Sequence, residues 1–229
     1  MTIAYVEQRL MSLKNHKKYE IEMEISGEWA LWSRPDTGAN KVSEICPFYS
    51  SVKGIFESVL FMPTVEICPT EITICNPVKF SPYSLNYSGM HRRDREIESE
   101  STMQIRFSTL RNVCYKLKAI AINNRDESVI SDLAKKYVKN NINHAHAYID
   151  MFNRRLKRGT FRRVPHLGKA DFLCDYCGPP RSETKACESI NKNINSMLVA
   201  CFDKPVKGSF NPVFAQNVKI EKGVLNLVK

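Results

Sequence analysis

The residues best suited to chemistry in this sequence form a basic run near residue 160. Seven cations fall within 16 residues with no acid among them: Arg154, Arg155, Lys157, Arg158, Arg162, Arg163 and Lys169. Such a run can bind phosphate groups, which would position a nucleic acid without reading its sequence. The alternative is a solvated helix end, where cations suit the negative end of the helix dipole. His166, within the run, is a candidate for direct contact with the same ligand.

A second candidate site mixes aromatic rings with cations between residues 79 and 102. Its members are Phe80, Tyr83, Tyr87, His91, Arg92, Arg93 and Arg95. Stacking faces combined with cations are what single-stranded RNA sites use. Because the segment is long and polar, we expect an excursion off the core that is mobile or ordered only by a partner. The alternative is a disordered surface loop.

Cysteines and histidines give a weaker signal. Cys174 and Cys177 form a CxxC pair with Cys187 nearby, but a zinc site needs four ligands and no second pair is present. His144 and His146 are two residues apart and so lie on different faces of a helix, which disfavours a shared metal. We therefore predict reduced, buried thiols, no metal and no cofactor.

Composition points to a polyanionic partner. The chain of 229 residues has 34 Lys and Arg against 24 Asp and Glu, a net charge of +10. This favours RNA or DNA as the partner. The first 20 residues lack the apolar region of a signal peptide, and no stretch approaches the ~20 apolar residues that span a bilayer. We predict a cytoplasmic protein without a membrane partner.

The elements that must position these residues follow from periodicity. Segments with alternating or β-branched patterns predict strands at 18–33, 64–78, 195–202, 212–220 and 223–228. Residues 103–122 hold a further strand, centred on 113–122. Two segments predict helices: 50–61, capped by Ser50 or Ser51, and 132–157. The inward positions of the second are Leu133, Tyr137, Ile149, Phe152 and Leu156.

This order of elements predicts an α+β fold. It suits a ferredoxin-like (RRM/RAMP) βαββαβ domain over residues 1–175, with a thumb-like excursion at about 79–102. Residues 176–229 would form a small C-terminal antiparallel β-sheet. Fold alone does not give function, so the sites must decide it.

Four stretches resemble the type I-C branch of the fifth CRISPR-associated (Cas) protein family, in the RAMP superfamily. They are GEWALWSRPDTGANKVS (27–43), PFYSSVKGIFESVLFMPT (47–64), TLRNVCYKLKA (109–119) and FNRRLKRGTFRRVPHLGKADFLCDY (152–176). A weaker likeness lies in EKGVLNLV near the C-terminus. The stretches fall in family order and cover most of the chain from Tyr19 onward.

The resemblance implies a function in antiviral defence. Members bind the repeat-derived 5′ handle of CRISPR RNA and cap one end of an interference complex, so the implied partners are this RNA and the other type I-C subunits. DNA could be bound non-specifically. Type I-C members also cut the precursor RNA within the repeat without a metal, leaving a 2′,3′-cyclic phosphate. That reaction needs a base, an acid and a cation beside the phosphorane.

This sequence departs from the family where the cutting chemistry is expected. Leu60 and Phe61 stand where the family has Tyr or His, and Ala119 and Ile120 stand where a Lys-His or Ala-His pair is expected. Three neighbours are the remaining catalytic candidates: Tyr115, Lys116 and Lys118. Three functions stay open: an RNA-binding subunit, an active metal-independent endoribonuclease, and a nucleic-acid binder outside CRISPR.

Overall fold

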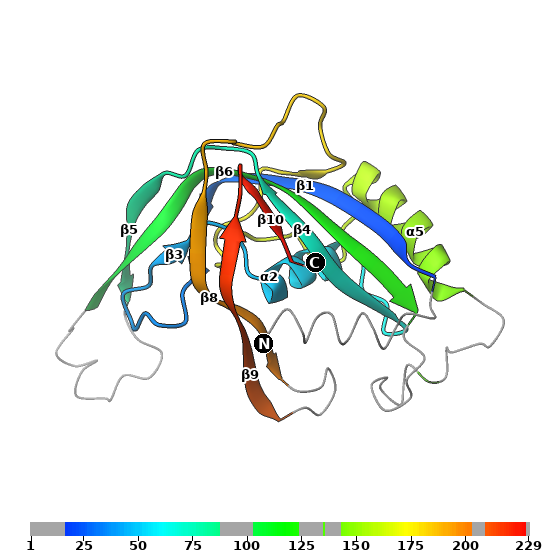
Figure 1. Ribbon diagram of the computed structural model, residues 1–229, viewed down its shortest axis with the longest axis horizontal. Helices are drawn as coiled ribbons and strands as arrows, with labels where there is room; N and C mark the ends of the chain where they lie inside the picture. The colour runs from blue at the N-terminus through cyan, green and yellow to red at the C-terminus, as the bar shows by residue number, and fades with distance from the viewer. Residues whose placement is uncertain (1–16, 88–102, 124–134, 136–142, 203–208, 228–229) are drawn as a thin grey trace.

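The computed structural model describes residues 17–87, 103–123, 135, 143–202 and 209–227 (Figure 1). Its main feature is a six-stranded sheet in which all pairs are antiparallel. The strands are β1 (Tyr19–Ala30), β4 (Val65–Ile74), β5 (Phe80–Tyr87), β6 (Met103–Asn123), β7 (Tyr176–Gly178) and β10 (Val224–Asn226). They run in the order β10-β4-β6-β1-β7, with β5 paired to the first half of β6.

The central four strands have the ferredoxin-like arrangement. Their order β7-β1-β6-β4 joins β1 to β4 through helix α2 (Tyr49–Val59) and β6 to β7 through helix α5 (His144–Arg158). The predicted α+β, ferredoxin-like fold is therefore confirmed. β10 extends this sheet beyond β4.

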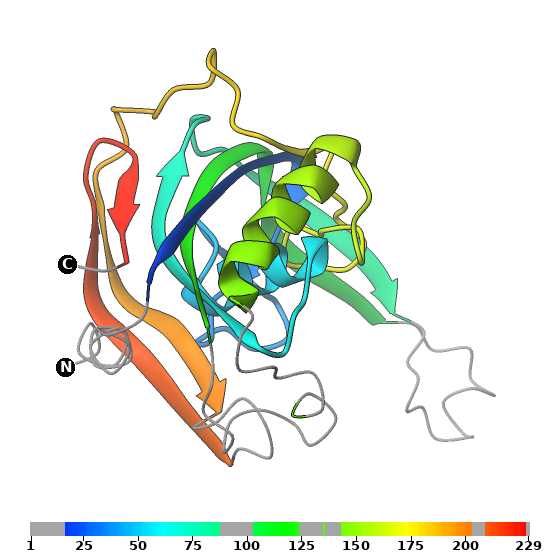
Figure 2. The ribbon, with the colours of Figure 1, turned by 90° about the vertical axis from the view of Figure 1, so that its right-hand side faces the viewer.

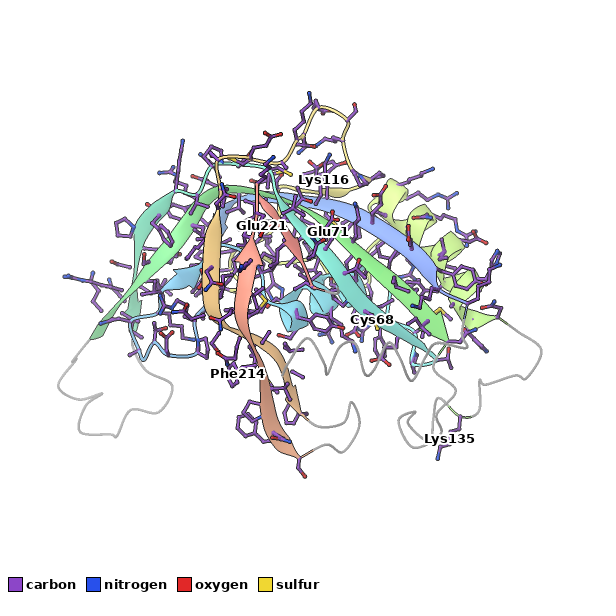
Figure 3. All side chains as sticks on the ribbon, viewed as in Figure 1. Cys68, Glu71, Lys116, Lys135, Phe214 and Glu221 are labelled. Carbon is purple, nitrogen blue, oxygen red and sulfur yellow. The ribbon has the colours of Figure 1, made fainter. Side chains whose placement is uncertain are left out.

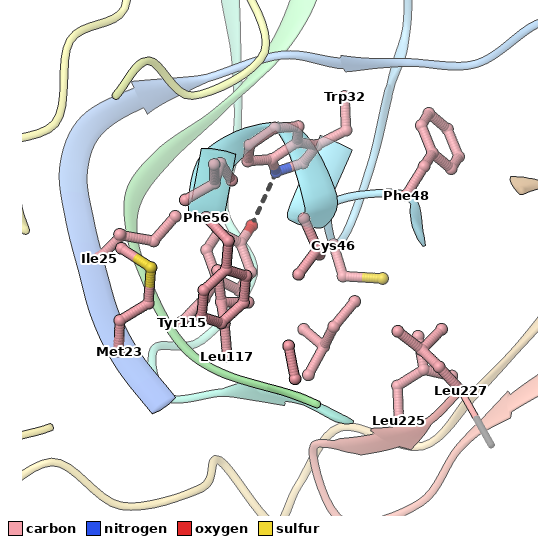
Figure 4. Close-up of a cluster of buried hydrophobic side chains, with 14 of the residues drawn as sticks. Met23, Ile25, Trp32, Cys46, Phe48, Phe56, Tyr115, Leu117, Leu225 and Leu227 are labelled. Carbon is pink, nitrogen blue, oxygen red and sulfur yellow. Dashed lines mark hydrogen bonds between the residues drawn. The ribbon is translucent and has the colours of Figure 1, made fainter. Parts of the chain in front are cut away.

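Alternation decides which side of the sheet is buried. Ile21, Met23 and Ile25 of β1 pack in the core, whereas Glu20 and Glu22 are exposed on the opposite face. In a strand successive side chains point to opposite faces, so one face can be apolar and the other polar. The core lies between the apolar face and the helices, and Figure 4 shows Phe56 of α2 beside residues of β1 and β6.

Each helix buries one stripe. Residues at spacings of three and four are buried: Val52, Ile55, Phe56 and Val59 in α2, and Ala145, Tyr148, Phe152 and Leu156 in α5. The predicted inward positions Phe152 and Leu156 are buried and Ile149 is half-buried, while Leu133 and Tyr137 lie outside the described residues.

The helix ends differ in how they are capped. Phe48, not Ser50 or Ser51, is the N-cap of α2 and makes no side-chain hydrogen bond, so the predicted cap is wrong. The helix begins at Tyr49, so Ser50 and Ser51 lie inside its first turn and cannot cap it, and Phe48 at the N-cap is buried in the core. In α5 the Asn143 side chain accepts a hydrogen bond from His146 N, and Gly159 ends the helix at φ 66°, a conformation that suits glycine.

Two further strand pairs complete the structure. β2 (Trp32–Ser33) pairs with β3 (Ser43–Glu44), and β8 (Lys192–Phe202) pairs with β9 (Phe210–Ile220). In Figure 2 the β8–β9 hairpin and α5 lie on opposite sides of the molecule. β7 and β10 join the main sheet, and the division of the chain at about residue 175 stays a prediction.

The predicted excursion begins as regular structure. Residues 80–87 form β5 and pair with residues 103–110 of β6, which makes β6 longer than the strand centred on Val113 to Ile122 that the pattern predicts. Residues 88–102 lie outside the described residues. No described helix is long and apolar enough to cross a membrane.

Candidate nucleic-acid interface

The basic run occupies the last turn of α5 and the loop that follows it. Six of its side chains are exposed: Arg154, Lys157, Arg158, Arg162, Arg163 and His166. Arg155 and Lys169 are half-buried. Cations here suit the negative end of the helix dipole, and their exposure leaves them free to meet phosphate as well.

The run is anchored on the C-terminal end of α2. Arg155 Nη1 donates to Val59 O at 3.4 Å, and the backbone N–H groups of Arg162 and Arg163 donate to Val59 O and Ser58 O at 3.2 and 2.9 Å. Carbonyls at a helix end lack partners within the helix, so these bonds satisfy them. Because Arg162 and Arg163 bind through their backbones, their guanidinium groups stay available.

One carboxylate borders the run. Burial raises the pKa of Glu57, Lys53 and Arg162 act against this rise, and Glu66 adds to it. The Arg162 guanidinium lies 5.2 Å from the ring centre of Phe61, which is 44% exposed. A cation stacked on an exposed ring gives an RNA base a second surface to contact.

An aromatic cluster lies where β1, β5, β6 and the basic loop meet. Tyr83 of β5 contacts Trp29, Phe107 and Phe172 at ring-centre distances of 5.6, 6.4 and 5.1 Å. Trp29 and Tyr83 are half-buried, whereas Phe107 and Phe172 are buried. The cluster therefore has a buried base and two partly accessible rings.

Two cations flank this cluster. Arg111 lies 5.0 Å from the ring centre of Trp29 and pairs with Glu28 at 2.8 Å. Lys169 lies 5.7 Å from that of Phe172 and pairs with Asp171. Tyr83 and Lys169 were predicted as RNA contacts in two separate segments. Both contact Phe172, so they belong to one site.

The basic loop can approach β1 this closely because of a glycine. Leu31 N donates to Leu167 O at 2.9 Å, and Gly168 follows at φ 91°. A Cβ on Gly168 would lie 1.9 Å from Leu31 O, which no side chain could tolerate. Gly168 therefore sets the position of Lys169 and Phe172.

Sequence reasoning missed Trp29, Arg111 and Phe172 as members of this interface. The sequence could have indicated these three residues, because each lies in a different stretch that carries the family resemblance. Of the predicted residues, His91, Arg92, Arg93 and Arg95 and the side chain of Tyr87 lie outside what the structure describes.

The catalytic candidates have a different setting. Tyr115 is 1% exposed; its hydroxyl donates to Ile45 O at 3.0 Å and accepts from Trp32 Nε1 at 3.2 Å (Figure 4). Burial raises the pKa of Tyr115. The hydroxyl is enclosed by the core, so it could reach RNA only if the core opened.

The two lysines lie on the opposite face of β6. Lys116 Nζ donates to Arg181 O and Thr184 O at 2.8 and 2.6 Å. Lys118 Nζ lies 2.9 Å from Glu71, whose hydrogen bond raises the pKa of Lys118. Lys118 is thus a cation at neutral pH, and Figure 3 shows Lys116 and Glu71 on this part of the sheet.

A buried glutamate ties the segment 181–184 to the same face. Glu24 is 0% exposed and accepts hydrogen bonds from Arg181 N, Arg181 Nε and Thr184 Oγ1 at 2.8, 2.7 and 2.6 Å. Burial alone would raise the pKa of Glu24, but the bonds from Thr184 and Arg181 lower it below its usual value. Glu24 and Lys116 together hold this segment across the sheet.

The eight cysteines form no disulfide bond. Cys46, Cys68 and Cys114 are buried as predicted. The prediction of buried thiols is wrong for the other five, which are half-buried: Cys75, Cys174, Cys177, Cys187 and Cys201. A hydrogen bond with Cys177 lowers the pKa of Cys174. Across the described ranges, no group of three or more His, Cys, Asp and Glu could hold a metal ion.

Solved structures share this fold. A crystal structure of a CRISPR-associated protein matches with a TM-score of 0.64 at 18% identity, covering 92% of this chain and 93% of the other. A functionally uncharacterized protein from Streptococcus mutans matches with a TM-score of 0.65 at 17% identity over the same shares. The chain therefore shares the fold of these two proteins.

Two proteins that share one name are similar to the chain in sequence. No protein-family model matches. The chain is 26% identical over 181 residues to the CRISPR pre-crRNA endoribonuclease Cas5d of Thermus thermophilus, covering 78% of this chain and 71% of that protein. It is 23% identical over 199 residues to the protein of the same name from Mannheimia succiniciproducens, covering 78% and 83%. The predicted resemblance to the type I-C branch of the fifth Cas family is confirmed, because the chain is similar in sequence to these two Cas5d proteins.

Proposed function

We propose that this chain is an RNA-binding subunit of a type I-C CRISPR interference complex and holds the repeat-derived 5′ handle of CRISPR RNA. The observation that carries the proposal is the meeting of three family-like stretches at one site, where Trp29, Arg111 and Lys169 join stacking faces to cations. Its homology to two proteins named Cas5d supports the choice of RNA.

Two parts of the interface do different work. The exposed cations of the α5 end and its loop contact phosphates and set the position of the RNA. The partly accessible rings of Trp29 and Tyr83 stack against unpaired bases. The same phosphate contacts would bind DNA weakly and without sequence preference.

The remaining partners follow from the same proposal. The chain binds the other subunits of the complex, and it acts in the cytoplasm, where CRISPR transcripts are made. Tyr87, at the end of β5, and the predicted residues His91, Arg92 and Arg93 add to the RNA contact.

A second candidate function is repeat cutting, because both relatives are named endoribonucleases. In this reaction the ribose 2′-hydroxyl loses its proton and attacks the adjacent phosphate, and the 5′-oxygen leaves, giving a 2′,3′-cyclic phosphate. Lys118 is held protonated by Glu71 and Lys116 is bonded to two carbonyls. Lys118 can serve as a cation beside the phosphate, whereas the Lys116 Nζ already donates to the segment 181–184.

The test is to incubate the purified chain with its own repeat RNA in EDTA. We expect tight binding without a product, or slow cleavage that Lys116→Ala with Lys118→Ala abolishes while binding survives. Because Lys116 also holds the segment 181–184, Lys118→Ala alone is the cleaner variant for chemistry.

Other outcomes would change the proposal. Fast, EDTA-resistant cutting that is indifferent to both substitutions would place an active site elsewhere. Absence of repeat binding at low salt would refute the RNA-binding function itself.

A further inference from the structure

A groove separate from the RNA interface runs beside strand β8. Its volume is about 450 Å³, and it lies between the loop Arg34–Asp36 and residues 192–196. Glu44 of β3 and Phe214 of β9 complete its lining. None of these residues belongs to the basic run or the aromatic cluster.

The groove follows the edge of β8 rather than its face. Five consecutive residues, 192–196, line it. Side chains alternate between the faces of a strand, so a hollow touched by five in a row must run along the strand's edge. It is as long as these five residues, roughly 16 Å.

This edge of β8 has no strand partner within the described part of the chain. The other edge pairs with β9, as in Lys192↔Ile220 and Ser196↔Gln216, and no described backbone hydrogen bond outside that pair involves residues 193–196. An unpaired edge presents N–H and C=O groups that another extended chain can pair with.

The groove differs from the RNA interface in its net charge. Arg34 Nε is bonded to Asp36 at 3.0 Å and Lys192 Nζ to Glu44 at 2.7 Å, so two cations meet two anions. In a chain of net charge +10, this surface is neutral, whereas the α5 end carries exposed cations with no acid within their run. A polyanion gains little from a neutral groove.

The other lining groups fit an uncharged polypeptide. Asn193 and Asn195 are exposed amides, Ser196 is a half-buried hydroxyl, and Ile194 is buried. Phe214 is half-buried and gives an apolar contact. Amides and hydroxyls beside a free strand edge suit an extended segment that pairs through its main chain and places small side chains in the hollow.

We propose that the groove accepts an extended, uncharged polypeptide segment of a partner protein, which adds as a strand to the free edge of β8. The inference rests on the proposed function only in taking the partner to be another subunit of the same complex. Pairing along five residues would bury the unpaired backbone groups and fix the orientation of the two proteins.

Hydrogen exchange tests the proposal on the wild-type chain. It is measured for the free chain, for the chain with repeat RNA, and for the chain reconstituted with the other subunits and RNA. We expect those amides of residues 193–196 that point away from β9 to exchange at least about tenfold more slowly only in the complete complex. Unchanged exchange in the complex would overturn the proposal, and equal protection by RNA alone would show the groove to be an RNA site.

A groove-filling variant gives a second readout. Asn195→Trp should weaken incorporation into the complex at least about tenfold, the cost of losing a strand pairing. Lys219→Trp is the matched control, because Lys219 pairs with Asn193 on the same sheet but does not line the groove. Equal incorporation of Asn195→Trp and Lys219→Trp would overturn the proposal.

The RNA affinity of each isolated variant separates the two proposals. Both tryptophan variants should bind repeat RNA as the wild type does. A wild-type chain that binds no repeat RNA would refute the proposed function. Whether the groove binds a partner segment would still be decided by the hydrogen exchange of residues 193–196 when the complex assembles.

Discussion

Glu24 shows how much one buried carboxylate can determine. Glu24→Gln keeps the size of the side chain but removes the charge that Arg181 and Thr184 bind. We expect a loss of roughly 1.5–3 kcal/mol in the free energy of unfolding, the range for hydrogen bonds to charged groups. Glu28→Gln, on the same strand but with an exposed partner in Arg111, should cost less than about 1 kcal/mol. Urea unfolding of both variants measures the difference, and equal losses would contradict the account.

The same residue predicts a pH dependence. The pKa of Glu24 is lowered in the folded protein, so the unfolded chain binds its proton first as the pH falls. The stabilisation by Glu24 is complete above its usual pKa of 4.5 and is lost as the pH falls below it toward the lowered value. The stability gap between the wild type and Glu24→Gln should therefore narrow below pH 4.5.

The catalytic candidates show what a strand pattern reveals and what it does not. Alternation correctly predicts that Lys116 and Lys118 share a face of β6 and that Tyr115 lies on the other. It does not show what meets those faces. Glu71 and the segment 181–184 arrive from distant parts of the chain, and they decide that one lysine is an ion-pair partner and the other a structural cation.

Two glycines, one inside α2 and one at the end of α5, should respond to alanine substitution in opposite ways: one change stabilises the protein and the other destabilises it. A Cβ on Gly54, inside α2, would meet nothing within 4 Å, so Gly54→Ala should stabilise the protein by roughly 0.5–1 kcal/mol. Gly159 ends α5 at φ 66°, where alanine is strained, so Gly159→Ala should cost roughly 1–2 kcal/mol. Chemical unfolding of both variants tests this. A loss of stability for Gly54→Ala, or a gain of stability for Gly159→Ala, would contradict this account of the two glycines.

The elements were predictable where one periodicity dominates. α2, α5 and the C-terminal strands follow their apolar patterns, and the family-like stretches fall on them. The pattern predicts β5 as part of a polar excursion because Pro82 interrupts it and a polar stretch follows, although Tyr83, Leu85 and Tyr87 alternate with polar residues. Its order comes from pairing with β6, a tertiary contact that overrides weak local preference.

The site assembles only at the level of the whole molecule. Trp29 lies opposite Arg111 and Tyr83 lies opposite Phe107 because of the register of β1 and β5 against β6. A slip of one residue would turn these rings to the other face, and sequence alone does not fix the register. The basic run was predictable from composition, whereas its junction with the aromatic cluster was not.

The distribution of charge leads to the last prediction. The helix-free face of the sheet carries both signs of charge, with Glu71 paired to Lys118 and Glu24 to Arg181, whereas the exposed cations of the α5 end have no acid within their run. RNA should therefore bind at the α5 end. Arg154, Lys157 and Arg158 are all exposed, and replacing them by Ala spares Arg155, whose bond to Val59 O supports the fold.

This triple variant should bind repeat RNA more weakly and with less dependence on salt. Each phosphate contact to a single strand contributes about 0.7 to the slope of log affinity against log salt, so the loss of three contacts should flatten the slope by roughly 2. A control that removes three exposed cations elsewhere, Lys18, Lys185 and Lys219, lowers the net charge equally. If both variants flatten the slope to the same extent, net charge alone attracts the RNA. If only the first does, the cations at the α5 end contact its phosphates directly, because a general field would respond to both changes alike.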